Sequence, residues 1–380
     1  MKSAPPVIGY CGRMFDDACP AAAADLAARI GAKLDELGAA EAYGPLACGA
    51  DILIAEALLA RGARLHVVLP FAEDDFIAES VLCGGESWLP RYRACRDAAA
   101  SVQFATPGAY VGDDHQFAYN TRLVMGLTAL RAQETGGEAV QLAVLSQDPS
   151  LSRTGIAGAH ADVRLWQELG GRTEEVGTGA VTRNLRFPRH DWPNSGTRRE
   201  IRSIIFADYK GFSRLGEREL PLFMHEVMGR IGAVLTEFGD HVEFRNTRGD
   251  AIYAIVDKPT TAARIALRLQ RALQGLPEAL TPPGDEAGMR LGLHYGPIWV
   301  GTDRITGNRI WYGGEVNRTA RIEPVTPVGG VYCTESFAAA LLIDHCDDCA
   351  FTPVGVQPLA KDFGEVMLYR LDRACGIEPA

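Results

Sequence analysis

The chain has 380 residues, which is enough for two or three ordinary domains. Hydrophobic residues make up 47% and charged residues 23%, as in a folded globular protein, which excludes a disordered or membrane-embedded chain. The formal net charge of −10 argues against binding to nucleic acid or to anionic membranes through a basic surface.

No apolar run is long enough to span a membrane, and the first residues do not resemble a signal peptide. The nine cysteines are scattered along the chain. We therefore expect a cytoplasmic protein with reduced thiols. One close pair, Cys346 and Cys349, is by itself a weak signal for zinc or redox chemistry.

Apolar strands and amphipathic helices alternate along the first half of the chain. Strands are expected at 7–10, 43–47, 65–70, 100–104 and 139–145, and helices at 20–37, 52–60, 119–132 and 159–169. All-apolar strands that alternate with helices are typical of a parallel sheet covered by helices. The pattern predicts an α/β doubly wound domain.

Ligands of such sheets bind beyond the carboxyl ends of the strands. Gly12, Arg13, Gly49 and Asp51 lie at these ends, and Gly49 opens a helix whose first amides suit a phosphate. Tight turns explain the glycines equally well.

The order GYCGR … ACGADILIAEALLARGARLHVVLPF resembles the SLOG superfamily of nucleotide sensors, which has a Rossmann-like fold. The resemblance implies a regulatory domain over residues 1–185 with a nucleotide-like ligand at these four residues. The PGGxGTxxE motif of its hydrolytic members is absent, which favours binding over hydrolysis. Residues 186–200 are rich in proline and charge and predict a linker. A second domain is expected over 201–374.

In the second domain, two acidic residues lie next to apolar strands. Asp208 follows the strand expected at 203–207, and Asp250 precedes the strand at 251–256. Carboxylates from two neighbouring strands are suitable ligands for the hard cations of a phosphoryl-transfer site. A polar pair follows, since a helix from Gly314 places Asn317 and Arg321 four residues apart on one face. An amide and a guanidinium suit a ribose oxygen and a phosphate, although either residue alone is more often an ordinary surface residue.

These segments together resemble the catalytic domain of class III nucleotidyl cyclases. They are FADYKGFS, RGDAIYA, LGLHYGP and YGGEVNRTARI, in that order. The resemblance implies an α+β ferredoxin-like domain that works as a homodimer on a nucleoside triphosphate. Asp208 and Asp250 would hold two Mg²⁺ or Mn²⁺ ions per site, Asn317 and Arg321 would act from the partner chain, and Lys361 would bind the triphosphate.

The resemblance also implies which residues line the substrate. These are Tyr209, Gly211, Phe212, Asn246, Arg248 and Ile310. In purine cyclases the positions of Asn246 and Ile310 read the base, with Lys and Asp or Thr for adenine and with Glu and Cys for guanine. This chain has neither pair, and Ile310 offers no hydrogen bond. We expect ATP slightly ahead of UTP or CTP, the substrates of the pyrimidine cyclases of bacterial antiphage signalling.

Two other classes of function compete with a cyclase. A catalytically silent cyclase-like domain would dimerise and sense nucleotide, but retention of both aspartates, Asn317 and Arg321 favours an enzyme. A DNA-processing protein is disfavoured by the acidic balance of the chain. We therefore expect no nucleic-acid partner and no membrane partner.

Overall fold

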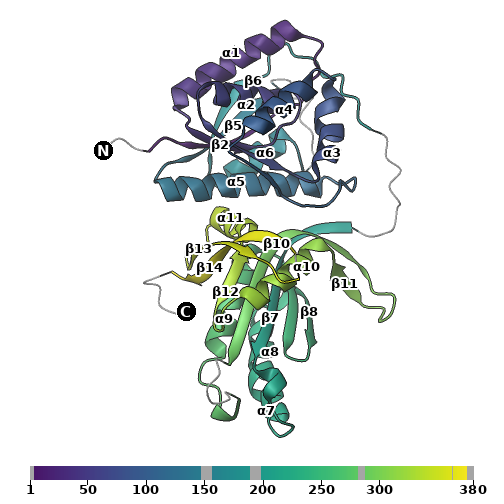
Figure 1. Ribbon diagram of the computed structural model, residues 1–380, viewed down its shortest axis with the longest axis vertical. Helices are drawn as coiled ribbons and strands as arrows, with labels where there is room; N and C mark the ends of the chain where they lie inside the picture. The colour runs from purple at the N-terminus through teal and green to yellow at the C-terminus, as the bar shows by residue number, and fades with distance from the viewer. Residues whose placement is uncertain (1–3, 147–155, 189–197, 281–286, 362, 375–380) are drawn as a thin grey trace. The chain divides into compact units, whose positions relative to one another are not determined.

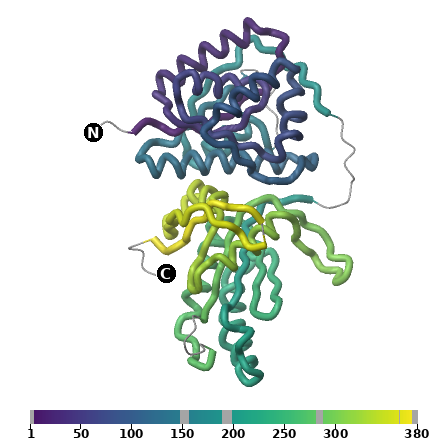
Figure 2. The backbone as a smooth tube through the Cα atoms, in the orientation of Figure 1, coloured from purple at the N-terminus to yellow at the C-terminus, as the bar shows by residue number. Residues whose placement is uncertain are grey.

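The computed structural model describes residues 4–146, 156–188, 198–280, 287–361 and 363–374. The chain divides into two compact units, Met1–Asn194 and Ser195–Ala380. Figure 2 traces the backbone of each. Most of the expected linker, residues 189–197, lies outside the described residues.

The first unit is built on a sheet of six strands in the order β4-β3-β2-β1-β5-β6. Every neighbouring pair is parallel. The strands are β1 (Val7–Gly12), β2 (Glu41–Gly44), β3 (Arg64–Leu69), β4 (Ser101–Phe104), β5 (Ala139–Leu145) and β6 (Arg172–Gly177). The predicted α/β class with a parallel sheet is thus confirmed for this unit.

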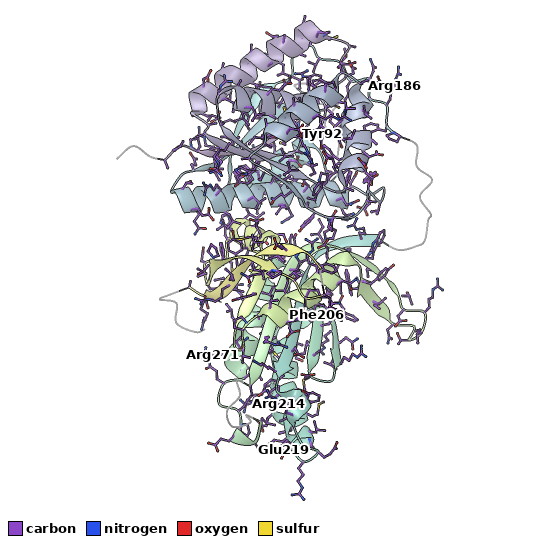
Figure 3. The ribbon with its side chains drawn as sticks, in the orientation of Figure 1. Tyr92, Arg186, Phe206, Arg214, Glu219 and Arg271 are labelled. Carbon is purple, nitrogen blue, oxygen red and sulfur yellow. The ribbon has the colours of Figure 1, made fainter. Side chains whose placement is uncertain are left out.

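Helices cover the sheet of the first unit. They are α1 (Pro20–Leu37), α2 (Ala50–Ala60), α3 (Glu73–Phe76), α4 (Trp88–Ala98), α5 (His115–Thr135) and α6 (Ala159–Glu168). Helix α2 contacts α1 and α4, whereas α5 contacts α6 and strands β1 and β5. Figure 1 shows α1 and α5 on opposite sides of the strands. Tyr92 of α4, labelled in Figure 3, is buried in the core of this unit.

Two predicted elements of the first unit differ from the structure. The strand expected at 43–47 ends at Gly44, because Pro45 has no amide hydrogen to continue the ladder. The helix expected at 119–132 begins earlier, at His115, and ends at Thr135. Strand β6 was not predicted because its sequence, RTEEVG, is polar, and most of its side chains are at least partly exposed.

The second unit has a mixed sheet in the order β13-β14-β12-β10-β7-β9-β8, with β11 paired to β10. Only β10 and β12 run parallel among the described pairs. The strands are β7 (Arg198–Lys210), β8 (Val242–Arg248), β9 (Ala251–Val256), β10 (Gly288–Thr302), β11 (Arg309–Tyr312), β12 (Val331–Thr334), β13 (Cys349–Pro358) and β14 (Glu365–Arg373). This unit is α+β.

Five α-helices are described in the second unit: α7 (Leu220–Phe223), α8 (Gly229–Glu237), α9 (Pro259–Ala272), α10 (Gly314–Ile322) and α11 (Glu335–Ile343). The helix expected at 220–235 is α7 and α8 joined by a π-helical turn at Met224–Met228. Within the described ranges, every helix is too short or too polar to cross a lipid bilayer.

The central strand pair is longer than the sequence indicates. Asp208 was expected at the end of a strand, but β7 continues to Lys210 because residues 208–210 pair with β10. Asp208 therefore lies within the sheet, on the face that carries Phe206 of the same strand. Figure 3 labels Phe206 among the strands of this unit.

Candidate active site

The carboxylate of Asp208 is held by the neighbouring strand. In the antiparallel ladder, Asp208 of β7 lies opposite Arg290 of β10. Arg290 Nη2 lies 2.6 Å from Asp208 Oδ2 and 2.6 Å from Glu323 Oε1. One guanidinium thus bridges two carboxylates, and all three side chains are only partly exposed.

Asp250 lies in the turn between β8 and β9, and its carboxyl hydrogen-bonds to Asp208. Burial, followed by the charge of Asp208, raises the pKa of Asp250 to about 6. The backbone amide of Tyr209 acts in the opposite direction. The two predicted acidic residues are therefore neighbours, and the charge of Asp208 disfavours ionisation of Asp250.

Glu323 follows α10 and is a third carboxylate of this group. Burial raises its pKa to about 7, with further contributions from the charges of Asp208 and Asp250, while Arg290 opposes the shift. Gly292 of β10 allows the backbone of Glu323 to lie close to the strand, because a Cβ on Gly292 would lie only 3.0 Å from the Glu323 amide nitrogen. The end of α10 packs on β10 where the strand has no side chain.

The residues present fit a hard divalent cation. Carboxylate oxygens are preferred ligands of Mg²⁺, which in nucleotide enzymes takes one or two carboxylates and completes its shell with phosphates and water. Asp208 and Asp250 supply two such groups, and repulsion between them favours a bound cation. Elsewhere in the described chain, ligand atoms of Cys346, Asp348 and Cys349 also lie within 4.8 Å of one another, and Arg264 pairs with Asp348 at 2.9 Å as Arg290 pairs with Asp208.

Helix α10 carries the predicted polar pair. Asn317 is exposed, while Arg321 is partly buried. The Nε of Arg321 is buried and has no hydrogen-bond partner among the described residues. The first turn of α10 is anchored by Glu315, whose Oε2 lies 2.8 Å from His294 Nε2. His294 Nδ1 lies 2.8 Å from Thr334 Oγ1, and burial lowers the pKa of this histidine.

Three predicted substrate residues follow Asp208 in sequence. The ring of Tyr209 is buried against Phe223, and its hydroxyl donates to the Leu280 carbonyl at 3.3 Å, so its backbone rather than its ring reaches Asp250. Gly211 has a φ of 109°, which glycine adopts without strain. Phe212 packs on Phe223 and faces the Gly249 turn.

Tyr253 lies beside both predicted base positions, Asn246 and Ile310. Asn246 lies opposite Tyr253 in the β8–β9 ladder. The Tyr253 hydroxyl donates to the Trp311 carbonyl at 3.0 Å, next to Ile310. The Tyr253 ring stacks on Phe206, with centroids 4.8 Å apart.

The other candidates are more dispersed. Arg248 and Lys361 are exposed, and in the described part of the chain neither forms an ion pair with Asp208 or Asp250. In the first unit, Gly12, Arg13 and Asp51 line one large cavity. Gly49 caps α2 with a φ of 95° and lies tightly against Phe15 and the Arg13 carbonyl, so its role there is conformational.

With this geometry described, comparison with known proteins identifies the second unit. Residues 197–371 match the model of the adenylate and guanylate cyclase catalytic domain. The second unit belongs to the class III cyclase family. It is the catalytic domain of a nucleotidyl cyclase. No curated protein matches the chain.

Solved structures similar to this chain include three cyclases. The adenylyl cyclase CyaB from P. aeruginosa is 16% identical, with a TM-score of 0.41, and the match covers 48% of this chain and 99% of that one. An adenylate cyclase from Trypanosoma brucei is 20% identical, with a TM-score of 0.41 and coverage of 47% and 91%. The guanylate cyclase domain of RhGC from Catenaria anguillulae, in complex with GTP, is 19% identical, with a TM-score of 0.39 and coverage of 46% and 98%.

Two residues of the cyclase domain site were missed in the sequence. Arg290 was expected only as part of a strand, and Glu323 was not singled out at all. The register of β7 on β10 brings Arg290 to Asp208, and the end of α10 brings Glu323 to Arg290. A signal was present, since Arg290 directly precedes the segment LGLHYGP and Glu323 directly follows the segment YGGEVNRTARI.

Proposed function

We propose that the cyclase domain converts a nucleoside triphosphate into a 3′,5′-cyclic nucleotide and pyrophosphate. The observation that carries this proposal is the adjacency of Asp208 and Asp250 within a domain of this family. The ribose 3′-oxygen attacks the α-phosphorus, its proton leaves, and the bond to pyrophosphate breaks. Two Mg²⁺ or Mn²⁺ ions held by these aspartates would lower the pKa of the 3′-hydroxyl and neutralise the triphosphate.

The side chains of α10 complete this site from a second copy of the chain. Arg321 has an unsatisfied Nε, so a phosphate oxygen from a substrate held by the partner would satisfy it. At the α-phosphate, the guanidinium would stabilise the charge that develops in the transition state. Asn317 is exposed on the same helix face and would orient the ribose. We therefore propose a homodimer in which each site uses both chains, with Lys361 on the triphosphate.

We propose ATP as the preferred substrate. The Asn246 amide both donates and accepts hydrogen bonds and can therefore pair with an adenine edge, while Ile310 provides only packing. The same observation supports a pyrimidine cyclase, because Ile310 lacks the polar group that reads a purine at its position. The contacts of this pocket decide such selectivity.

We also propose that the first unit, over residues 1–185, is a doubly wound, Rossmann-like regulatory domain. Its parallel order, with β1 between β2 and β5, is consistent with such a fold. A silent nucleotide sensor remains the alternative for the whole protein.

A turnover assay with the four nucleoside triphosphates tests the proposed function. The full chain is incubated with each nucleotide and Mn²⁺, and the product is identified by mass. We expect a cyclic nucleotide from ATP, and cUMP or cCMP would instead support the pyrimidine alternative. Absence of a cyclic product with all four nucleotides would contradict a catalytic role and leave the silent sensor.

A further inference from the structure

The turn between α11 and β13 brings two cysteines of the cyclase domain together. Helix α11 ends at Ile343, and His345 then adopts a φ of 53°, a left-handed conformation that glycine more often provides after a helix. The amide of Cys349 donates to the Cys346 carbonyl at 3.3 Å, which closes the turn. The two cysteine side chains meet at this turn.

The sulfur atoms of these cysteines are close enough to be joined. Cys346 Sγ lies 2.8 Å from Cys349 Sγ, and the Cys346 thiol is the donor. A disulfide needs about 2.05 Å between its sulfurs, so these atoms would have to move by less than about 1 Å. Both residues are partly exposed, so a small reagent can reach them. A second sulfur pair, Cys48 and Cys83, is wider at 3.7 Å and almost completely buried.

Asp348 holds the turn against helix α9. Arg264 of α9 donates to its two carboxylate oxygens, at 2.9 and 3.1 Å. This contact lowers the pKa of Asp348, so its carboxyl stays ionised. Asp348 Oδ1 lies 3.2 Å from Cys346 Sγ and is a second acceptor for that thiol. The neighbouring Cys349 sulfur, followed by burial, raises the pKa of Cys346. Because the thiolate is the nucleophile and Cys346 keeps its proton, Cys349 is the sulfur that reacts first.

A metal ion is the competing occupant of this turn. Ligand atoms of Cys346, Asp348 and Cys349 lie within 4.8 Å of one another, and within the described ranges no further His, Cys, Asp or Glu joins them. A structural zinc ion almost always takes four protein ligands. A disulfide here would close a very short loop at a partly exposed site, and such bonds stabilise a fold little and are readily reduced. These features favour a reversible bond between the sulfurs.

We propose that Cys346 and Cys349 form a redox-active dithiol, a modification site that a small disulfide of the glutathione class oxidises. The Cys349 thiolate attacks one sulfur of that disulfide, and the other sulfur leaves as a thiolate with the electron pair of the broken bond. Cys346 then loses its proton to water and attacks the Cys349 sulfur, which releases the second thiolate. The two cysteines lose two electrons and two protons, and the small disulfide gains them as two thiols. The proposal does not depend on cyclase activity.

The test equilibrates the full, reduced chain in buffers with increasing ratios of oxidised to reduced glutathione. The remaining thiols are alkylated, and mass spectrometry locates each modification after digestion. Cleavage after Glu335 separates the pair from Cys333. We expect the peptide with Cys346 and Cys349 to lose two hydrogen atoms and to escape alkylation, and we expect reduced glutathione to reverse both changes.

Single variants separate the two steps of the reaction. Cys346→Ser should retain a glutathione adduct on Cys349, because no second thiol displaces it, and Cys349→Ser should lose the intramolecular bond. Cys19→Ser is the matched control, since it removes another partly exposed thiol and should leave oxidation of the pair unchanged. Circular dichroism checks that each variant is folded.

The unmodified chain alone decides against the proposal if a variant does not fold. The proposal is overturned if Cys346 and Cys349 stay reduced, if they carry only glutathione adducts, or if the buried pair Cys48 and Cys83 oxidises first. Zn²⁺ is added to the reduced chain as a separate probe. Zinc that protects the pair from alkylation and stays bound during dialysis against a chelator would show a metal site instead.

Discussion

Arg290 lies directly across the sheet from Asp208, and their side chains meet at 2.6 Å. The same guanidinium lies 2.6 Å from Glu323, at the end of the helix that carries Arg321. Arg290 therefore links the candidate metal ligand Asp208 to Glu323, at the carboxyl end of α10. The guanidinium of Arg290 also partly neutralises these two carboxylates.

Arg290→Gln should destabilise the cyclase domain by about 1–3 kcal/mol in the absence of metal, because two partly buried carboxylates lose their charged partner. Urea unfolding in the presence of a chelator measures this change. Arg264→Gln is the matched control, since Arg264 is about half exposed and pairs with Asp348 at the surface. It should cost less than about 1 kcal/mol. Equal costs for the two variants would contradict the role given to Arg290.

Asp208→Ala and Asp250→Ala should each abolish cyclic-nucleotide formation while the chain stays folded. Each removes one of the two carboxylates proposed to hold the metal ions. Product assays with Mn²⁺, together with circular dichroism, measure both properties. Asp240→Ala removes an exposed acidic residue of the same domain and should leave turnover unchanged. Near-normal turnover by either Asp208→Ala or Asp250→Ala would reject the metal site.

Gly292→Ala should displace α10 from β10. The new Cβ would lie 3.0 Å from the Glu323 amide nitrogen and 3.0 Å from Ile322 Cβ, which is too tight without movement. We expect a loss of about 1–3 kcal/mol in the free energy of unfolding and a large loss of turnover. Gly232→Ala is the control, because its Cβ would meet nothing within 4 Å and alanine favours the helix α8. The prediction fails if both variants unfold at the same urea concentration as the unmodified chain.

Metal binding should weaken as the pH falls below about 6, because burial and the charge of Asp208 raise the pKa of Asp250 to that value. Without metal, the folded state binds a proton that the unfolded state has already released between the ordinary pKa of 3.8 and about 6. The contribution of Asp250 to stability therefore falls as the pH rises through this window. Mn²⁺ titrations and urea unfolding across this range check both signs. Asp250→Asn should remove this contribution to the pH dependence of stability.

Much of the fold was predictable from hydrophobic periodicity. Helix α1 and strand β5 have the bounds that the pattern predicted. The helix has one apolar face and is followed by Gly38, and the strand is a continuous, mostly apolar run. Strand β6 and helix α4 were not predicted. Their sequences are rich in charge, and only contacts with the rest of the unit indicate where their apolar residues are buried.

The candidate site was predictable where it depends on local order. Asp208, Asp250, Asn317 and Arg321 belong to segments whose sequence alone resembles cyclase motifs. Arg290 could not be placed by the same reasoning, because its role depends on the register between two strands that are 82 residues apart at this pair. Tyr209 was predicted to contact the substrate, but its ring is buried in the core. Side chains of a strand alternate between the two faces of the sheet, and the sequence alone does not indicate which face carries the site.

The central claim is that each active site needs both chains, with aspartates from one and α10 from the other. Its most direct test mixes Asp208→Ala chains with Arg321→Ala chains, each inactive alone, and measures cyclic-nucleotide formation. The heterodimer would contain one site with both aspartates and an intact Arg321, so we expect part of the activity to return. If the mixture stays inactive although heterodimers are shown to form, the shared site does not exist.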